Sequence, residues 1–248
     1  MKEEYQPEIQ KQLFRKDKSK FSKYIELFVG KKSIWTLLKY ELITLLFSNI
    51  PGAIGILLRN IFFPFLFKKV GKNVSFGRNL TLRHPHKISI DNDVVIDDNC
   101  MLDAKGIDNN GISIQSGTFI GRNSILTCKN GNIVIEKNVN IGFNSEIFSA
   151  SNVVIGENTL IAAYVYVIGG DHKYNLADKP ISEQGRVSKG ITIGKNCWLG
   201  AKSLILDGVN VGNDSIIGAG AVVNQDIPPF SIAVGIPARV IKDRRTQE

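Results

Sequence analysis

Cysteine and histidine are scarce in this 248-residue sequence, which has three of each. Three cysteines cannot form the disulfide framework of a small secreted domain. Two of them, Cys100 and Cys197, fall at the small position of a sequence repeat described below, which predicts buried, reduced thiols. The first twenty residues are too polar and too mixed in charge for a signal peptide. Together these absences predict a cytoplasmic protein.

The chain also lacks an uninterrupted apolar run of ~20 residues, the length that a membrane-spanning helix needs. Over residues 42–67 the only charge is Arg59, but a polar and helix-breaking stretch at 49–52 divides the run. Apolar residues at helical spacing predict one helix over 34–47 and a second over 54–65. Because lysines flank both, short amphipathic helices on a membrane surface fit the pattern better than a spanning segment. Packing of these helices on the protein itself is the open alternative.

The net positive charge is confined to the first part of the chain. Residues 1–72 hold 14 lysines and arginines against 6 acidic residues, whereas residues 73–248 hold 17 of each. A basic segment can face nucleic acid or an anionic membrane, but no zinc-finger or RNA-binding motif accompanies this one. The sequence therefore predicts no nucleic-acid partner, and contact with the inner face of an anionic membrane through residues 31–72.

A repeat of six residues dominates the rest of the chain. Between Ile191 and Val223 an aliphatic residue occupies every sixth position: Ile193, Leu199, Ile205, Val211, Ile217 and Val223. Such a period fits neither the 3.6 residues of a helical turn nor the alternation of a simple strand. It is typical of a parallel β-helix, in which each hexad forms a short strand and a corner, and three hexads close one coil.

The hexads define the expected organisation of the whole chain. Their aliphatic residues group in threes and predict about six to seven coils over residues 73–226, with extra residues inserted only between complete coils. A basic, amphipathic helical segment at 1–72 precedes the coils, and a capping tail at 227–248 follows them. The longest interruption, 168–190, predicts a functional loop, because long excursions from such an economical fold are usually functional.

This loop contains His172, which the sequence marks as a candidate general base. An imidazole titrates near neutrality and can remove a proton from a hydroxyl or an amine. The adjacent Asp171 is one candidate for orienting the ring, and a backbone carbonyl or a residue of another subunit are the alternatives. His84 and His86 are expected in a turn near the first coil, too far along the chain from His172 for a zinc site of three histidines. The sequence therefore predicts no metal.

Several stretches carry a family resemblance: ITIGKNCWLGAKSLILDGVNVG, IIGAGAVV, DIPPFSIAVGIPARVIK and GGDHKY. Residues 74–242 resemble the hexapeptide-repeat acyltransferases, whose fold is a left-handed β-helix, and above all the galactoside, maltose and polysaccharide O-acetyltransferases. The resemblance implies a homotrimer with sites between subunits, and acetyl-CoA as a co-substrate that transfers its acetyl group directly. The implied acceptor is a saccharide.

The resemblance also assigns roles to individual residues. His172, with Asp171, matches the catalytic position. The implied CoA-binding residues are Trp198, Gly200, Ala201, Gly218, Ala219, Asn224, Gln225, Arg239 and Lys242, and the implied acceptor-binding residues are Asn140, Asn144 and Trp198. Two departures from the family stand out: Asn224 and Gln225 replace a common Thr-Lys pair, and Gly142 replaces an acceptor-binding asparagine. The second departure predicts an acceptor different from simple galactosides.

The favoured function is O-acetylation of a sugar hydroxyl on a surface polysaccharide or a lipid-linked saccharide. N-acetylation of a nucleotide-linked amino sugar is an alternative, because the same base and donor serve both reactions. A non-catalytic β-helix scaffold is another, and it predicts that neither CoA nor His172 matters for the role of the protein.

Overall fold

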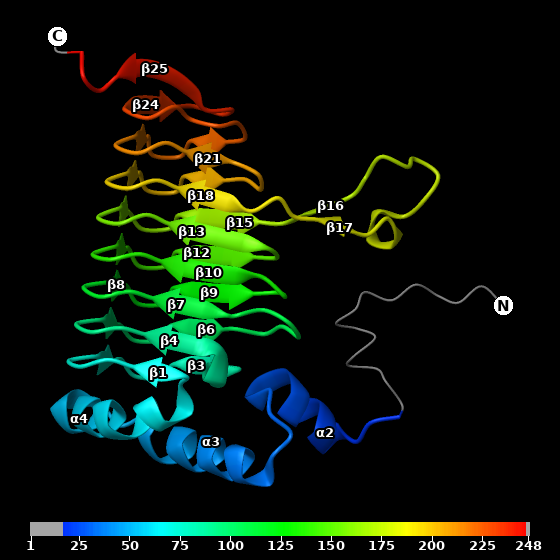
Figure 1. Cartoon of the computed structure of the whole chain (residues 1–248), viewed down its shortest axis with the longest axis vertical. Helices are drawn as coiled ribbons and strands as arrows, with labels where there is room; N and C mark the ends of the chain where they lie inside the picture. The colour runs from blue at the N-terminus through cyan, green and yellow to red at the C-terminus, as the bar shows by residue number, and fades with distance from the viewer. Residues whose placement is uncertain (1–16, 247–248) are drawn as a thin grey trace.

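The computed structural model describes residues 17–246, which form a β-helix with helices at one end (Figure 1). Each hexad supplies a short strand, and strands one coil apart pair in parallel to build three sheets along the rod. Sheet A contains β1 (Lys69–Val70), β4 (Ile88–Ile90), β7 (Ile112–Ile114), β10 (Asn132–Ile135), β13 (Asn152–Ile155), β18 (Ile191–Ile193) and β21 (Asn210–Val211). The period of six therefore predicted the fold class correctly.

The other two sheets complete each coil. Sheet B contains β2 (Ser75–Phe76), β5 (Val95–Ile96), β8 (Phe119–Ile120), β11 (Asn140–Ile141), β14 (Leu160–Ile161), β19 (Trp198–Leu199), β22 (Ile216–Ile217), β24 (Ser231–Val234) and β25 (Arg239–Asp243). Sheet C contains β3 (Thr81–Arg83), β6 (Met101–Asp103), β9 (Ile125–Cys128), β12 (Glu146–Ser149), β15 (Tyr166–Gly169), β20 (Leu204–Ile205) and β23 (Val222–Val223). Seven coils thus have strands in all three sheets, and β24 begins a further, partial coil.

The core is the interior of this prism. Every aliphatic residue of the hexad series from Ile193 to Val223 is buried, as are Cys100, Cys128 and Cys197. Burial raises the pKa of the Cys100 thiol to about 11 and that of Cys128 to about 12. These thiols are therefore protonated at neutral pH, which agrees with the prediction of buried, reduced thiols.

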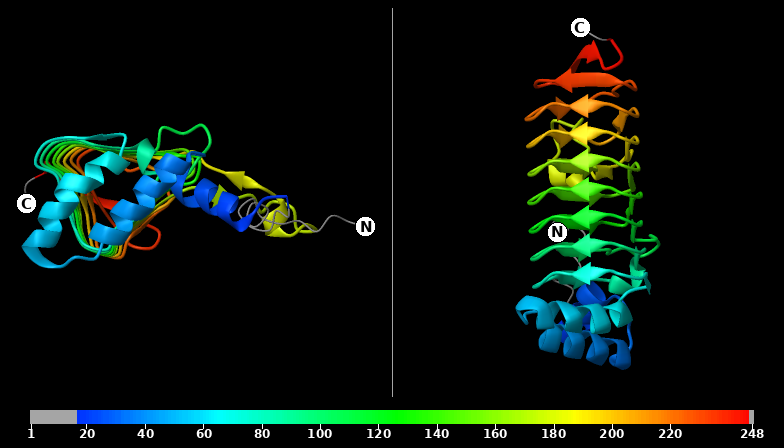
Figure 2. Two further views of the ribbon diagram at one scale, coloured as in Figure 1. Left: turned by 90° about the horizontal axis from the view of Figure 1, so that it is seen from below. Right: turned by 90° about the vertical axis from the view of Figure 1, so that its left-hand side faces the viewer.

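Extra residues enter the solenoid only at the corner between sheets C and A. The 3-10 turn η3 (Pro85–Lys87), the loop at 104–111 and the long excursion after β15 all follow a strand of sheet C and precede one of sheet A. Viewed along the rod, the coils form a triangle and the long excursion leaves from one corner (Figure 2). The prediction that insertions share one corner is confirmed.

Helices cover the first coil. They are α2 (Lys20–Tyr24), the π-helical turn η1 (Ile25–Val29), α3 (Ile34–Phe47), α4 (Gly52–Phe62) and the 3-10 turn η2 (Phe63–Leu66). The prediction of a helix over 34–47 is confirmed, and the second predicted helix is α4 continued by η2. The ring of Phe63 packs against that of Phe76, which points into the first coil. No helix within residues 17–246 is long and apolar enough to span a membrane.

The opposite end of the rod is closed by a hairpin. Strand β24 pairs in parallel with β22 and in antiparallel fashion with β25, so β25 is the last strand of sheet B. The antiparallel pairing turns the chain back across the final coil, so the hairpin lies at the end of the solenoid.

Candidate functional site

The loop predicted from the sequence is an arm that projects from the rod after the fifth coil (Figure 1). Its stem is a two-stranded antiparallel sheet of β16 (Asp171–His172) and β17 (Arg186–Val187), and its far part contains a 3-10 turn, η4 (Ile181–Glu183). In this pairing His172 lies directly opposite Arg186. Side chains of directly opposed residues project from the same face of a sheet, so the register places the imidazole and the guanidinium side by side.

The base of the arm is held by a carboxylate from the next coil. Asp207 accepts hydrogen bonds from the backbone N–H groups of Lys189 at 2.8 Å and Gly190 at 3.0 Å. The hydroxyl of Ser188 donates to the carbonyl of Gly169 at 3.0 Å, which ties the two ends of the stem together. These bonds fix the direction in which the arm leaves the prism.

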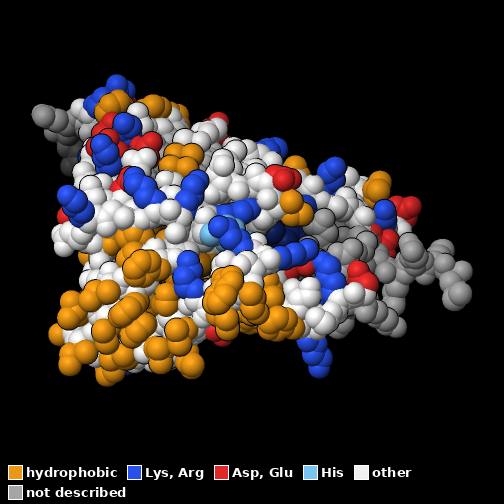
Figure 3. All heavy atoms as spheres, turned by 60° about the horizontal axis from the view of Figure 1, so that its bottom comes forward, with side chains coloured by type: hydrophobic (Ala, Val, Ile, Leu, Met, Phe, Trp, Pro, Cys, Tyr) orange, Lys and Arg blue, Asp and Glu red, His pale blue; other side chains and the backbone are white. Residues whose placement is uncertain are grey.

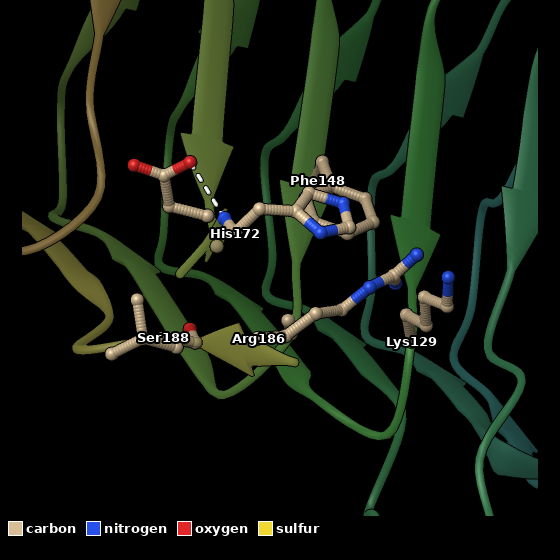
Figure 4. Close-up of a pocket in the computed structure, with 9 residues that line it drawn as sticks. Lys129, Phe148, His172, Arg186 and Ser188 are labelled. Atoms are coloured by element: carbon tan, nitrogen blue, oxygen red, sulfur yellow. Dashed lines mark hydrogen bonds between the residues drawn. The ribbon is translucent and has the colours of Figure 1, made fainter. Parts of the chain in front are cut away.

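A pocket of about 340 Å³ lies between the arm and the wall of sheet C. It is lined by Lys129, Phe148, Ala150, Gly170, Asp171, His172, Arg186, Val187 and Ser188. In Figure 4 the side chains of His172 and Arg186 both extend from the arm toward the wall, where Phe148 and Lys129 lie. The pocket is open to solvent on the arm side, because His172 and Arg186 are both exposed.

The carboxylate of Asp171 accepts a hydrogen bond from the backbone N–H of His172 at 2.7 Å, drawn as a dashed line in Figure 4. Within residues 17–246 the imidazole of His172 makes no hydrogen bond. In this structure Asp171 therefore holds the backbone of His172 and does not contact its ring.

Trp198 and Asn140 lie on a different side of the prism from His172. Both are exposed residues of sheet B, and both pair with Leu160, which lies between them in the neighbouring strand. Sheet B is the face opposite the C–A corner from which the arm leaves. Within one chain the tryptophan and the histidine are therefore separated by the width of the rod.

The corner between sheets B and C carries the small residues that the sequence singled out. Ala201 and Ala219 are exposed and stacked one coil apart, joined by a hydrogen bond from the Gly220 N–H to the Ala201 carbonyl at 2.8 Å. A side chain on Gly200 would lie 2.5 Å from the backbone of Ala219, so this glycine allows the coils to stack. A side chain on Gly218 would lie 2.7 Å from the side chain of Val234. Asn144 occupies the same corner two coils before Ala201.

The remaining candidates lie near the end of the rod. Arg239 and Lys242 are in β25, and Arg239 donates to the carbonyl of Ala238 at 2.9 Å. Asn224 and Gln225 are exposed and follow β23, on the way to the C–A corner. They do not lie on the same side of the rod as the small residues of the B–C corner.

His84 and His86 belong to the packing of the N-terminal helices. A ring nitrogen of His84 lies 2.9 Å from the carbonyl oxygen of Glu26, and the two imidazoles stack with centroids 5.8 Å apart. Gly30 adopts a φ of +76°, and a side chain there would lie 2.6 Å from the His84 ring, so glycine is needed on both counts. Within the described chain, no group of three or more metal-ligating side chains gathers here or elsewhere.

Sequence reasoning missed five residues of this region: Lys129, Phe148, Arg186, Ser188 and Asp207. Lys129 and Asp207 follow the third strand of their coils, as the arm does, so counting hexads would have placed them at the same corner. The position of Arg186 opposite His172 had no such signal, because the register of the stem follows no repeat.

Comparison with known proteins agrees with this architecture. Residues 132–168 and 190–225 match the family model described as the hexapeptide repeat of succinyl-transferase. The unmatched residues between the two segments are those of the arm. Galactoside O-acetyltransferase of Escherichia coli strain K12 is 40% identical over 112 residues, which cover 45% of this chain and 54% of that protein.

Two further relatives extend the likeness. WbbJ of the same organism, named as a lipopolysaccharide biosynthesis O-acetyl transferase, is 32% identical over 119 residues, covering 45% of this chain and 61% of that protein. The chain thus spans about half the length of these curated relatives. A mutant of AntD, an N-acyltransferase from Bacillus cereus solved with dTDP and coenzyme A, shares the fold with a TM-score of 0.53 at 24% identity, covering 80% of this chain and 91% of that one.

Proposed function

We propose that this hexapeptide-repeat protein is an acetyltransferase that moves an acetyl group from acetyl-CoA to a sugar hydroxyl. The observation that carries the proposal is an exposed histidine in a pocket, on an arm attached to a β-helix whose repeats resemble those of named acetyltransferases. The proposed acceptor is a saccharide of a surface polysaccharide or a lipid-linked precursor, in keeping with the similarity to WbbJ.

His172 is the proposed general base. Its imidazole would take the proton of the acceptor hydroxyl while that oxygen forms a bond to the acetyl carbonyl carbon. The carbon–sulfur bond of the thioester breaks, and the proton passes to the departing thiolate. Proton transfer of this kind contributes about 10²–10⁴-fold to rate. No acyl-enzyme is needed, since the described cysteines are buried and the pocket is not lined by one.

The B–C corner has a shape suited to a narrow, extended donor. Ala163, Ala201 and Ala219 stand in successive coils without side chains that would block the surface, and Trp198 is 52% exposed beside them. The N–H of Ala201 makes no hydrogen bond within residues 17–246 and could donate to the carbonyl oxygen as it gains charge. Arg239 at the end of the rod would contact phosphates. Acetyl-CoA supplies an activated thioester, and these residues would hold it.

Two neighbouring copies would be needed to assemble one site. The base is at the C–A corner, whereas Trp198 and Asn140 are on sheet B and Ala201 is at the B–C corner. A second copy that places its B–C side against the arm of the first joins the two sets. Repeating this contact by a threefold rotation closes a homotrimer with three equal sites.

The helical end of the rod is proposed to rest on a membrane. Exposed apolar side chains gather on α3, α4 and η2, as Figure 3 shows: Ile34, Trp35, Leu38, Leu42, Leu45, Leu46, Ile54, Ile56, Leu57, Ile61 and Phe65. Lysines at 31, 32, 39, 68 and 69 lie within or directly beside these elements in the sequence. An apolar face edged by basic residues binds anionic lipid through buried area and electrostatic attraction together. The proposed location is the cytoplasmic face of a membrane.

Each part of the chain has its own proposed role. Residues 1–72 attach the protein to the membrane, 73–226 form the transferase with its catalytic loop at 168–190, and 227–248 close the rod. In this arrangement the first coils face the lipid and the arm stands away from it.

The test is release of CoA from acetyl-CoA by the purified protein with a panel of sugars and polysaccharide repeat units, with His172→Ala in parallel. We expect acceptor-dependent release that falls by about 10²–10⁴-fold in the variant, while CoA still protects both proteins against thermal unfolding. Full activity of His172→Ala would overturn the role of the base, and a lack of both CoA binding and release would favour a scaffold. Loss of the product acetyl group in alkaline hydroxylamine identifies an ester, whereas an N-acetyl product resists it.

A further inference from the structure

The pocket beside His172 gathers positive charge. Arg186 enters it from β17, and Lys129 enters it from the C–A corner that follows β9. Asp171 is the acidic residue of the lining, and its carboxylate bonds to the backbone N–H of His172. In the part of the chain that the structure describes, the guanidinium of Arg186 forms no ion pair or hydrogen bond. Its charge is therefore available to a ligand.

The backbone fixes where this charge lies. Arg186 is the direct cross-strand partner of His172, and such partners have Cβ atoms about 4.5–5.5 Å apart. The N–H of Lys129 donates to the carbonyl of Ser149 at 2.8 Å, which ties its corner to the next coil. Figure 4 shows the guanidinium of Arg186 directed toward the amino group of Lys129. Two cations that converge in this way are stabilised by an anion between them.

We infer that Arg186 and Lys129 form an anion-binding subsite, and that the acceptor is a sugar carrying a carboxylate or a phosphate group close to the hydroxyl that receives the acetyl group. The planar fork of an arginine suits both groups, because it can donate two parallel hydrogen bonds to either. Holding the anion there places a neighbouring hydroxyl of the same sugar at the imidazole of His172. The half-buried ring of Phe148 forms the adjacent wall, against which a sugar ring packs. The expected effect on acetylation rate rests on the proposed transferase activity, whereas binding of the anionic sugar does not depend on it.

The test compares three acceptors that differ only in charge: methyl galactoside, its galacturonate counterpart and its phosphate ester. We expect kcat/KM for CoA release to favour an anionic acceptor by at least about 10-fold, the effect of one charged hydrogen bond. Arg186→Gln and Lys129→Gln should each remove most of that preference and leave the KM for acetyl-CoA unchanged. The relative rates of the carboxylate and the phosphate identify which anion the subsite prefers. The matched control is Lys173→Gln, a basic residue of the arm outside the pocket lining, which should keep the preference.

A second measurement separates this inference from the proposed reaction. Binding of the galacturonate glycoside is followed by saturation-transfer NMR without any acetyl-CoA, on the parent protein and on both variants. Weakened binding in the variants supports the subsite even if no sugar is acetylated. Equal use of charged and neutral acceptors would overturn the inference. A raised KM for acetyl-CoA in Arg186→Gln would overturn it by assigning the residue to donor binding. A change of oligomeric state in the same variant would overturn it by assigning the residue to a subunit contact.

Discussion

Arg59 donates a hydrogen bond through Nε to the carbonyl oxygen of Phe76 at 2.9 Å, and the next residue of α4, Asn60, accepts one from the N–H of Phe76 at 3.1 Å. Phe76 belongs to β2, the outermost strand of sheet B at this end of the rod. On sheet C the hydroxyl of Tyr40 donates to the carbonyl of Leu82 at 2.7 Å. The helices therefore pair with the exposed backbone edge of the first coil, which otherwise invites association with another sheet.

The guanidinium of Arg59 is the centre of this cap, and its loss should destabilise the fold. It is 1% exposed and also donates to the carbonyl of Ile50 at 2.7 Å. Arg59→Met keeps the volume but leaves these buried carbonyls without a donor, so we expect a loss of about 3 kcal/mol in the free energy of unfolding. Chemical denaturation measures it. Arg78→Met, which removes an exposed arginine 4.0 Å from Asp98, is the control and should change stability by less than about 1 kcal/mol; equal losses would contradict the capping role.

The apolar face of α3 and α4 offers a test of membrane attachment that leaves the cap intact. Leu42, Leu45 and Leu57 are 58%, 79% and 60% exposed, so replacing all three by glutamine should not disturb packing. Each exposed leucine contributes roughly 1 kcal/mol to lipid binding, so we expect about 100-fold weaker binding to vesicles of phosphatidylcholine and phosphatidylglycerol. Sedimentation with the vesicles measures it.

The control for that experiment replaces three leucines and isoleucines of similar exposure elsewhere, Ile107, Leu176 and Ile181, by glutamine. This variant should bind the vesicles as the parent does. If the intact protein does not bind them, α3 and α4 serve only to cover the first coil. Deletion of residues 1–72 is a poorer test, because it exposes the backbone edge that Arg59 and Tyr40 cover.

The repeat predicted most of the fold because a β-helix has one side-chain rule, applied at every sixth residue. That rule placed Ile193, Val223 and their equivalents in the core. The rule does not apply to Arg59, which precedes the repeats. A single charge in an apolar run fits a helix on a membrane surface as well as a helix packed on the first coil. The cross-strand pairing of His172 with Arg186 could not be predicted either, because the register of an inserted hairpin depends on its own turn and on the contacts that anchor it. The separation of Trp198 from His172 could have been derived, because hexad counting assigns one to sheet B and the other to the C–A corner.

Acid should loosen the attachment of the N-terminal helices through His84 and His86. Burial lowers the pKa of His84, and burial together with the nearby Lys31 lowers the pKa of His86 to about 4. An unfolded histidine has a pKa of about 6.5, so between pH 6.5 and 4 the unfolded state binds more protons than the folded state. The stability is therefore complete above pH 6.5 and declines as the pH falls toward 4.

For His86 we expect this decline to be about 1 kcal/mol, because the residue is only partly buried and solvent screens its charge. The burial of His84 acts in the same direction. Denaturation at a series of pH values measures it. His86→Gln should flatten the dependence between pH 6.5 and 4. A parent protein equally stable at both ends of that range would show that folding does not lower the pKa values of these two rings.

Asp207 should control the position of the arm without touching the substrate. Its carboxylate holds the backbone of Lys189 and Gly190 at the end of the arm, so Asp207→Ala frees one side of the stem that carries His172. We expect kcat to fall by between about 10- and 100-fold, since small displacements of a catalytic group are costly, with the KM for acetyl-CoA unchanged and faster proteolysis within 170–190. Asp207→Asn retains an acceptor oxygen and should recover most of the activity. The control is Asp226, which accepts a hydrogen bond from the N–H of Asn210 at 2.7 Å one coil further along the rod. Asp226→Ala should alter neither kcat nor proteolysis of the arm. A similar loss in both alanine variants would show that Asp207 contributes only to general stability.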